Sequence, residues 1–159
     1  MPAPTTRPLK DWEGVIYRNS GTYASPTLVQ MLNLRTVDTP DRKVEDEVTV
    51  RKSAGFKWTT SAGREIELNF QMLNVKGDAD VTALRTAYEA STPIEFFIVD
   101  YELSDDTARG VRAFCEIMEF TLKGEDKKSQ YFDVKCKPTW SDQAPEPVVG
   151  GSAWASALS

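Results

Sequence analysis

A chain of 159 residues is long enough to bury a substantial core in one domain, and its 40% hydrophobic content is typical of a globular protein. The formal net charge of −5 gives no general attraction to phosphate backbones or to anionic lipid. Because the sequence contains no histidine, Ser-His-Asp and Cys-His sites and histidine-containing zinc sites are excluded.

Residues 1–26 mix proline, glycine, serine and threonine around the short apolar sequence 14–17, which indicates an extended N-terminal arm. The first ten residues do not resemble a signal peptide. The longest apolar stretch, Ile94–Val99, is too short to span a bilayer, so we expect a cytosolic origin and no membrane contact.

Three strands are predicted in the first half of the chain. Leu28–Leu34 is typical of a strand that ends at the turn Thr39–Asp41, and Val44–Arg51 alternates with a period of two. In Glu65–Met72 every even position is apolar and every odd position is polar, which predicts one buried face and one wet face. The intervening segment Lys52–Arg64 is predicted to be a hairpin loop of about a dozen residues, a length usually tied to function or disorder.

The second half predicts a helix and three more strands. Asp78 and Asp80 can cap a helix over residues 80–90, whose apolar residues recur at helical spacing before Pro93. Ile94–Glu102 is apolar on both faces and suits the centre of a sheet. Strands at Val111–Lys123 and Gln130–Lys137 follow.

These elements predict a mainly β fold: an antiparallel β-sandwich or partly closed barrel with one flanking α-helix and a long hairpin loop. We expect three parts, namely the arm 1–26, a β-sandwich domain 27–141 and a C-terminal tail 142–159 that is flexible or bound to a partner.

No residue set favours catalysis, a metal or a cofactor. Glu45 and Glu47 share a strand face, but nothing in the sequence supplies the cleft that a carboxylate pair needs. Asp100, Glu102, Asp105 and Asp106 lack the spacing of a calcium loop and suit a solvated turn. Phosphate-binding glycine motifs are absent, Lys123–Lys128 suits a solvated hairpin tip, and Cys115 and Cys136 suit reduced core residues.

Two segments resemble a known family. The sequence of residues 15–27, VIYRNSGTYASPT, resembles the N-terminal segment of the major tail tube proteins of long-tailed bacteriophages, which are related in fold to the tube protein of type six secretion. The sequence of residues 137–141, KPTWS, is similar to the closing strand of these proteins. The resemblance extends over residues 12–145.

The resemblance implies a structural subunit of a tail tube. Its copies would form stacked homohexameric rings whose inner sheets join into one barrel around a channel for the genome. The implied lumen-lining residues are Glu45, Glu47, Thr49, Arg51, Glu65, Glu67, Asn69 and Gln71, with Asp133, Lys135 and Lys137 as further candidates. The first set holds four glutamates and one arginine, so it predicts an acidic lining that repels DNA.

The implied inter-ring stacking residues are Lys52, Phe56, Lys57, Trp58 and Arg64. The expected partners are other copies of this chain, double-stranded DNA that passes without specific binding, and the tape-measure, tail terminator or baseplate proteins. The expected location is the virion tail, assembled in the host cytoplasm.

Two alternatives remain open from the sequence. The chain could be a β-sandwich module that binds a ligand or protein through the aromatic loop 52–64, because exposed large aromatic residues are costly without a partner. An enzyme that uses carboxylates alone is the second alternative.

Overall fold

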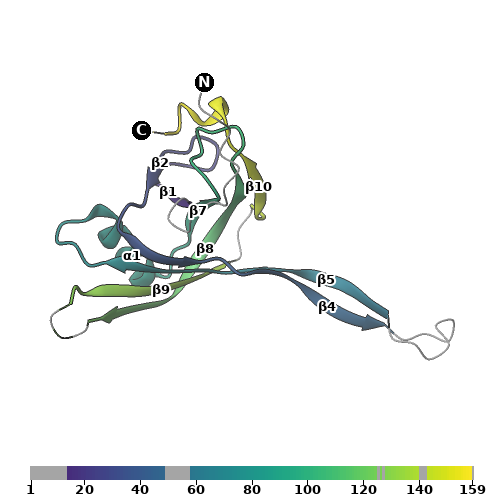
Figure 1. The fold of residues 1–159 in the computed structure, drawn as a ribbon, viewed down its shortest axis with the longest axis horizontal. Coiled ribbons are helices and arrows are strands. Elements are labelled where there is room, and N and C mark those ends of the chain that lie inside the picture. Colours follow the sequence, from purple (N-terminus) through teal and green to yellow (C-terminus); the bar gives the residue numbers. More distant parts are fainter. Residues whose placement is uncertain (1–13, 49–57, 125, 127, 140–142, 159) are drawn as a thin grey trace, which may run out of the picture.

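The computed structural model describes residues 14–48, 58–124, 126, 128–139 and 143–158, except for the side chains of residues 46–48 and 58–62 (Figure 1). The strands are β1 Val15–Asn19, β2 Leu28–Gln30, β3 Leu34–Asp38, β4 Asp41–Val48, β5 Trp58–Ile66, β6 Leu68–Leu73, β7 Ile94–Val99, β8 Arg109–Lys123, β9 Tyr131–Pro138 and β10 Glu146–Val149. Helix α1 spans Ala79–Ala90, and a 3-10 turn, η3, spans Ser152–Trp154.

The strands form one large sheet and one separate ribbon. The large sheet has the order β2-β1-β7-β8-β9-β6-β3, with β10 added to β8. Among the described residues β4 and β5 form a two-stranded sheet of their own. Neighbouring strands in both sheets are antiparallel. The prediction of a mainly β, antiparallel fold with one helix is confirmed, and the described strands do not close into a barrel.

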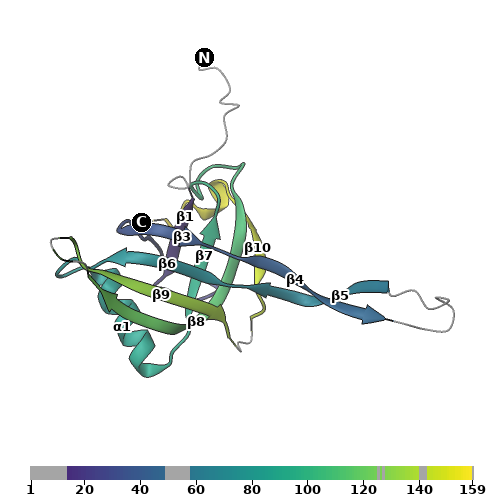
Figure 2. The same cartoon turned by 60° about the horizontal axis from the view of Figure 1, so that its bottom comes forward.

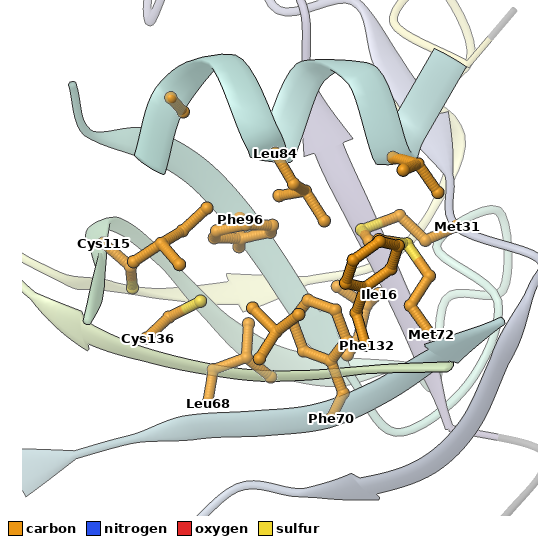
Figure 3. Close-up of a cluster of buried hydrophobic side chains, with 14 of the residues drawn as sticks. Ile16, Met31, Leu68, Phe70, Met72, Leu84, Phe96, Cys115, Phe132 and Cys136 are labelled. Atoms are coloured by element: carbon orange, nitrogen blue, oxygen red, sulfur yellow. The ribbon is translucent and has the colours of Figure 1, made fainter. Parts of the chain in front are cut away.

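Strand β8 joins the two halves of the large sheet. Its residues 110–115 pair with β7, and its residues 115–123 pair with β9. The main core contains side chains from β1 and β7 as well as from β6 and β9, so the two halves face each other across it. Helix α1 covers the core, as Figure 3 shows for Leu84 above Phe96. This arrangement is a sandwich made from one bent sheet.

The core follows the alternation of the strands. Leu68, Phe70 and Met72 of β6 are buried, and their polar neighbours are not (Figure 3). In β7, Phe96 enters the main core and Phe97 enters a second cluster on the other face of the sheet. The prediction that this strand is buried on both faces is confirmed.

Helix α1 begins and ends as its sequence predicts. The Asp78 side chain accepts a hydrogen bond from the backbone N–H of Asp80, so Asp78 is the N-cap. Ser91 ends the helix in the left-handed conformation, with φ of 52°.

Two predicted strands are each divided in the structure. Leu28–Leu34 becomes β2 and β3, because β2 pairs with β1 while β3 crosses to pair with β6. Glu65–Met72 is interrupted at Glu67, whose backbone N–H donates to the Pro40 carbonyl where the chain leaves the ribbon and enters the large sheet. Local alternation cannot show such crossings.

Residues at both ends of the described chain belong to the sheet. Val15–Asn19, which the sequence placed in an arm, forms β1 between β2 and β7. In the segment predicted as a tail, β10 pairs with β8, and the indole N–H of Trp154 donates to the Val149 carbonyl. The buried Ala157 completes the cover over the second cluster.

Candidate functional surfaces

A continuous polar face lies on β6, β9 and the second half of β8. Directly opposite residues share a face, and the register places Asn69 opposite Lys135 and Lys135 opposite Glu119. On β6 and β9 the apolar neighbours of these residues point into the core. We call this surface the polar sheet face, and its members are Glu67, Asn69, Gln71, Glu116, Glu119, Thr121, Lys123, Asp133, Lys135 and Lys137.

Each lysine of the polar sheet face is paired with a carboxylate from an adjacent strand or strand end. Lys123 Nζ lies 2.6 Å from Asp133 Oδ2, and Lys135 Nζ lies 3.3 Å from Glu119 Oε2. Lys137 Nζ lies 3.5 Å from Glu67 Oε1. The hydrogen bond with Asp133 raises the pKa of Lys123. Because the lysines are about half exposed and the carboxylates are partly exposed, the pairs affect the charge of the face more than the stability of the fold.

The predicted lumen set is divided by the register of the ribbon. Glu65 lies opposite Arg42 and therefore shares its face. Glu45 is three residues farther along β4 than Arg42, so it lies on the other face of the ribbon. The lumen-lining role of Glu45 and Glu65 stays a prediction. In the ribbon the two residues lie on different faces, because alternation within each strand does not fix how two strands are aligned.

The ribbon of β4 and β5 extends away from the rest of the molecule (Figures 1 and 2). At its base the Arg64 Nε donates to Asp41 Oδ1 at 2.7 Å, and a second Arg64 nitrogen contacts the other carboxylate oxygen. These hydrogen bonds lower the pKa of Asp41. The described side chains 41–45 and 63–65 are exposed. A two-stranded hairpin is marginally stable alone, so this ribbon suits a partner that covers it.

The other predicted stacking and lining residues are only partly placed. Trp58 begins β5 and Arg64 lies within it, so residues 58–64 of the predicted hairpin loop belong to a strand that pairs with β4. Glu47 lies in β4. The side chains of Glu47 and Trp58, and all of Thr49, Arg51, Lys52, Phe56 and Lys57, are outside the described residues.

Two open strand edges were missed by the sequence reasoning. In the described part of the chain, residues 116–123 of β8 pair on one side only, with β9. At the other end of the same layer, β6 is the one described strand that pairs with β3. Among the described strands, the layer β8-β9-β6-β3 therefore has an unpaired edge on each side. Open edges attract further strands.

The described residues offer little for catalysis. They contain no cluster of three or more acidic, cysteine or histidine residues able to hold a metal. Asp105 accepts hydrogen bonds from the backbone N–H and hydroxyl of Thr107, and Asp100 accepts one from the Arg109 N–H, so both shape a turn. Burial raises the pKa of Cys115 to about 12, which keeps it a protonated thiol.

One open groove lies between β1, β7 and the base of the ribbon. Its volume is about 360 Å³, and Val15, Ile98 and Val111 contribute to its apolar wall. No described helix is long and apolar enough to cross a membrane.

Solved structures share this architecture. No protein-family model and no curated protein matches the sequence. The tail of an empty GTA particle with C6 symmetry matches with a TM-score of 0.70 and 14% identity, over 89% of this chain and 100% of that one. The SPP1 tail tube matches with a TM-score of 0.71 and 12% identity, over 91% of this chain and 81% of that one. The chain has the fold of a phage tail tube protein.

The fold also matches a chain of a baseplate structure. The baseplate of the anti-feeding prophage matches with a TM-score of 0.60 and 7% identity, over 91% of this chain and 98% of that chain. These solved structures are tail, tail tube and baseplate structures, not enzymes. The fold implied by the resemblance of residues 15–27 and 137–141 is confirmed.

Proposed function

We propose that this chain is a structural, non-enzymatic subunit of a phage tail tube, which assembles into stacked hexameric rings around a channel for genome delivery. The two open edges of the layer β8-β9-β6-β3 carry this proposal. An edge at each end of one layer allows head-to-tail contact between copies, and head-to-tail contacts that close give a ring.

The strand directions support continuous pairing between copies. Successive strands in the layer are antiparallel, so β8 and β3 run in opposite directions. When β3 of a second copy is placed beside β8, the antiparallel alternation continues without a break. The ring would thus become one closed barrel, and closure removes the exposed edges.

The position of the core selects the face that lines the channel. One face of the layer is covered by the core and by α1 of the same chain. The body of each subunit then lies outside the barrel, and the polar sheet face lines the bore. The lining would include Glu67, Asn69, Gln71, Asp133, Lys135 and Lys137, together with Glu119 and Lys123. The register of the ribbon favours only one of the predicted residues Glu45 and Glu65 in that lining.

The ribbon is suited to connect successive rings. It extends from the body with its described side chains exposed, and it leads to the sequence 52–57 with Phe56. The further partners we propose are passing double-stranded DNA and the tape-measure, terminator or baseplate proteins. The location would be the virion tail, after assembly in the host cytoplasm.

Cross-linking tests the edge contact. Thr36 lies on β3 and Thr121 on the open part of β8, and the native cysteines are buried. A Thr36→Cys/Thr121→Cys variant treated with a short bis-maleimide should give covalent products up to the hexamer, and electron microscopy of the same sample should show rings or tubes. Each single variant is the control and should give at most dimers. Only monomers in the double variant, with no rings at high concentration, would overturn the proposal.

A further inference from the structure

The polar sheet face carries cations where DNA is proposed to pass. Lysine side chains at the polar positions of β8 and β9 are between 48% and 58% exposed. Free lysines on such a surface would bind phosphates, because each neutralised phosphate releases a condensed counterion and adds to the affinity. A ring that presented them in every subunit would retain the duplex.

Each of these lysines already has a fixed counter-charge. The three ammonium groups lie 2.6, 3.3 and 3.5 Å from carboxylate oxygens of Asp133, Glu119 and Glu67. A phosphate that approached one of these lysines would also approach the neighbouring carboxylate. The lysine would then gain little by exchanging one anion for another.

We propose that Glu67, Glu119 and Asp133 are shielding residues, which prevent the lysines beside them from binding the phosphates of passing DNA. The inference rests on the proposed function, since it requires the polar sheet face to line the channel. It differs from a purely acidic lining, because each of the three lysines is neutralised locally by a carboxylate of an adjacent strand or strand end.

The lysines have a physical reason to be present. A closed ring lined only by carboxylates would place many like charges around one bore, and their mutual repulsion would oppose assembly. Alternating charges across β8, β9 and the start of β6 avoid this cost. Arg35 is held in a different way, with its guanidinium 4.9 Å from the centroid of the Tyr131 ring.

The test compares two triple variants that lose the same charge. Glu67→Gln/Glu119→Gln/Asp133→Asn exposes the lysines, whereas Glu89→Gln/Glu102→Gln/Asp106→Asn removes exposed acids outside the polar sheet face. Tubes of each variant and of the original protein are mixed with a short fluorescent DNA duplex and sedimented over a series of salt concentrations.

The shielding variant should retain at least about tenfold more duplex at low salt than the other two samples, and the excess should disappear as salt rises. If both triple variants retain the same amount of duplex, the proposal is overturned, because the loss of net charge alone would then explain the binding. If neither triple variant retains duplex, the proposal is overturned as well. If the shielding variant forms no tubes, the single variant Glu119→Gln, which exposes Lys135 alone, is measured by the same criteria with a smaller expected increase.

Failure of the proposed function would look different. In that case the original protein would form no tubes, or a cryo-EM map of its tubes would place Gln71 and Lys135 away from the bore. Tubes with these residues at the bore, but without duplex retention by the shielding variant, would reject only the shielding role.

Discussion

Replacing Arg112 with methionine should strongly destabilise the fold. Arg112 is 9% exposed, and its Nη2 donates to both carboxylate oxygens of Glu95, at 2.9 and 3.1 Å. Glu95 is 3% exposed and otherwise accepts a hydrogen bond from the Asn19 side-chain amide. The Arg112→Met variant would leave this carboxylate buried without its cation.

Removing one partner of a buried ion pair lowers the free energy of unfolding by about 3–5 kcal/mol, and we expect a loss of this size for Arg112→Met. The guanidinium also lies 3.9 Å from the centroid of the Tyr23 ring, and that cation–π contact contributes about 1 kcal/mol within the total. A double variant, Arg112→Met/Glu95→Gln, removes the buried charge as well. The free energy of unfolding of this double variant should be about 2 kcal/mol higher than that of Arg112→Met.

Urea denaturation of the unassembled protein, followed by tryptophan fluorescence and far-ultraviolet circular dichroism, measures both effects. Coincident transitions and an unchanged slope with urea would show that the comparison is between two states. If Arg112→Met lowers the free energy of unfolding by less than about 1 kcal/mol, the reasoning is refuted, because a loss that small is typical of a solvent-exposed salt bridge. Additive effects of the two substitutions would refute the coupling between them.

Three further predictions follow from burial and close packing. Burial keeps the Cys115 thiol protonated up to a pH of about 12, whereas the same thiol ionises above pH 9 in the unfolded chain. The free energy of unfolding should therefore fall as the pH rises between these two values. Maleimide should label Cys115 only after denaturation. Gly110→Ala should lower the free energy of unfolding by about 2 kcal/mol or more, because the added Cβ would lie 1.9 Å from the Ile98 carbonyl oxygen. The control Gly63→Ala adds a Cβ with no atom within 4 Å, so in a thermal melt it should unfold at the same temperature as the original protein. Leu68→Lys should yield insoluble or unfolded protein by circular dichroism, because Leu68 is fully buried, and a soluble folded product would contradict its place in the core.

The periodic segments could be read directly from the sequence. Alternation in Leu68–Leu73 and Tyr131–Pro138 predicts which side chains enter the core, since successive residues of any strand point to opposite faces. The helix is equally local, because Asp78 caps a backbone N–H only two residues away. The apolar sequence of β7 predicts burial on both faces for the same reason.

The alignment of separate segments was decided by the tertiary structure. Glu45 and Glu65 both look like wet-face residues in their own strands, yet the pairing of Arg42 with Glu65 puts them on opposite faces of the ribbon. The shielding pairs likewise depend on the offset between strands, as with Lys123 of β8 and Asp133 of β9. No local pattern contains that offset.

The sequence by itself determined the secondary structure of most of the sheet and helix and the burial of their apolar positions, because those depend on contacts between near neighbours and on a period of two or 3.6 residues. Only the tertiary structure decided that β1 is an inner strand, that β8 serves both halves of the sheet, and that two edges are open among the described strands. Those features arise when distant segments compete for the same hydrogen-bonding edges, and the outcome of that competition depends on the whole chain at once.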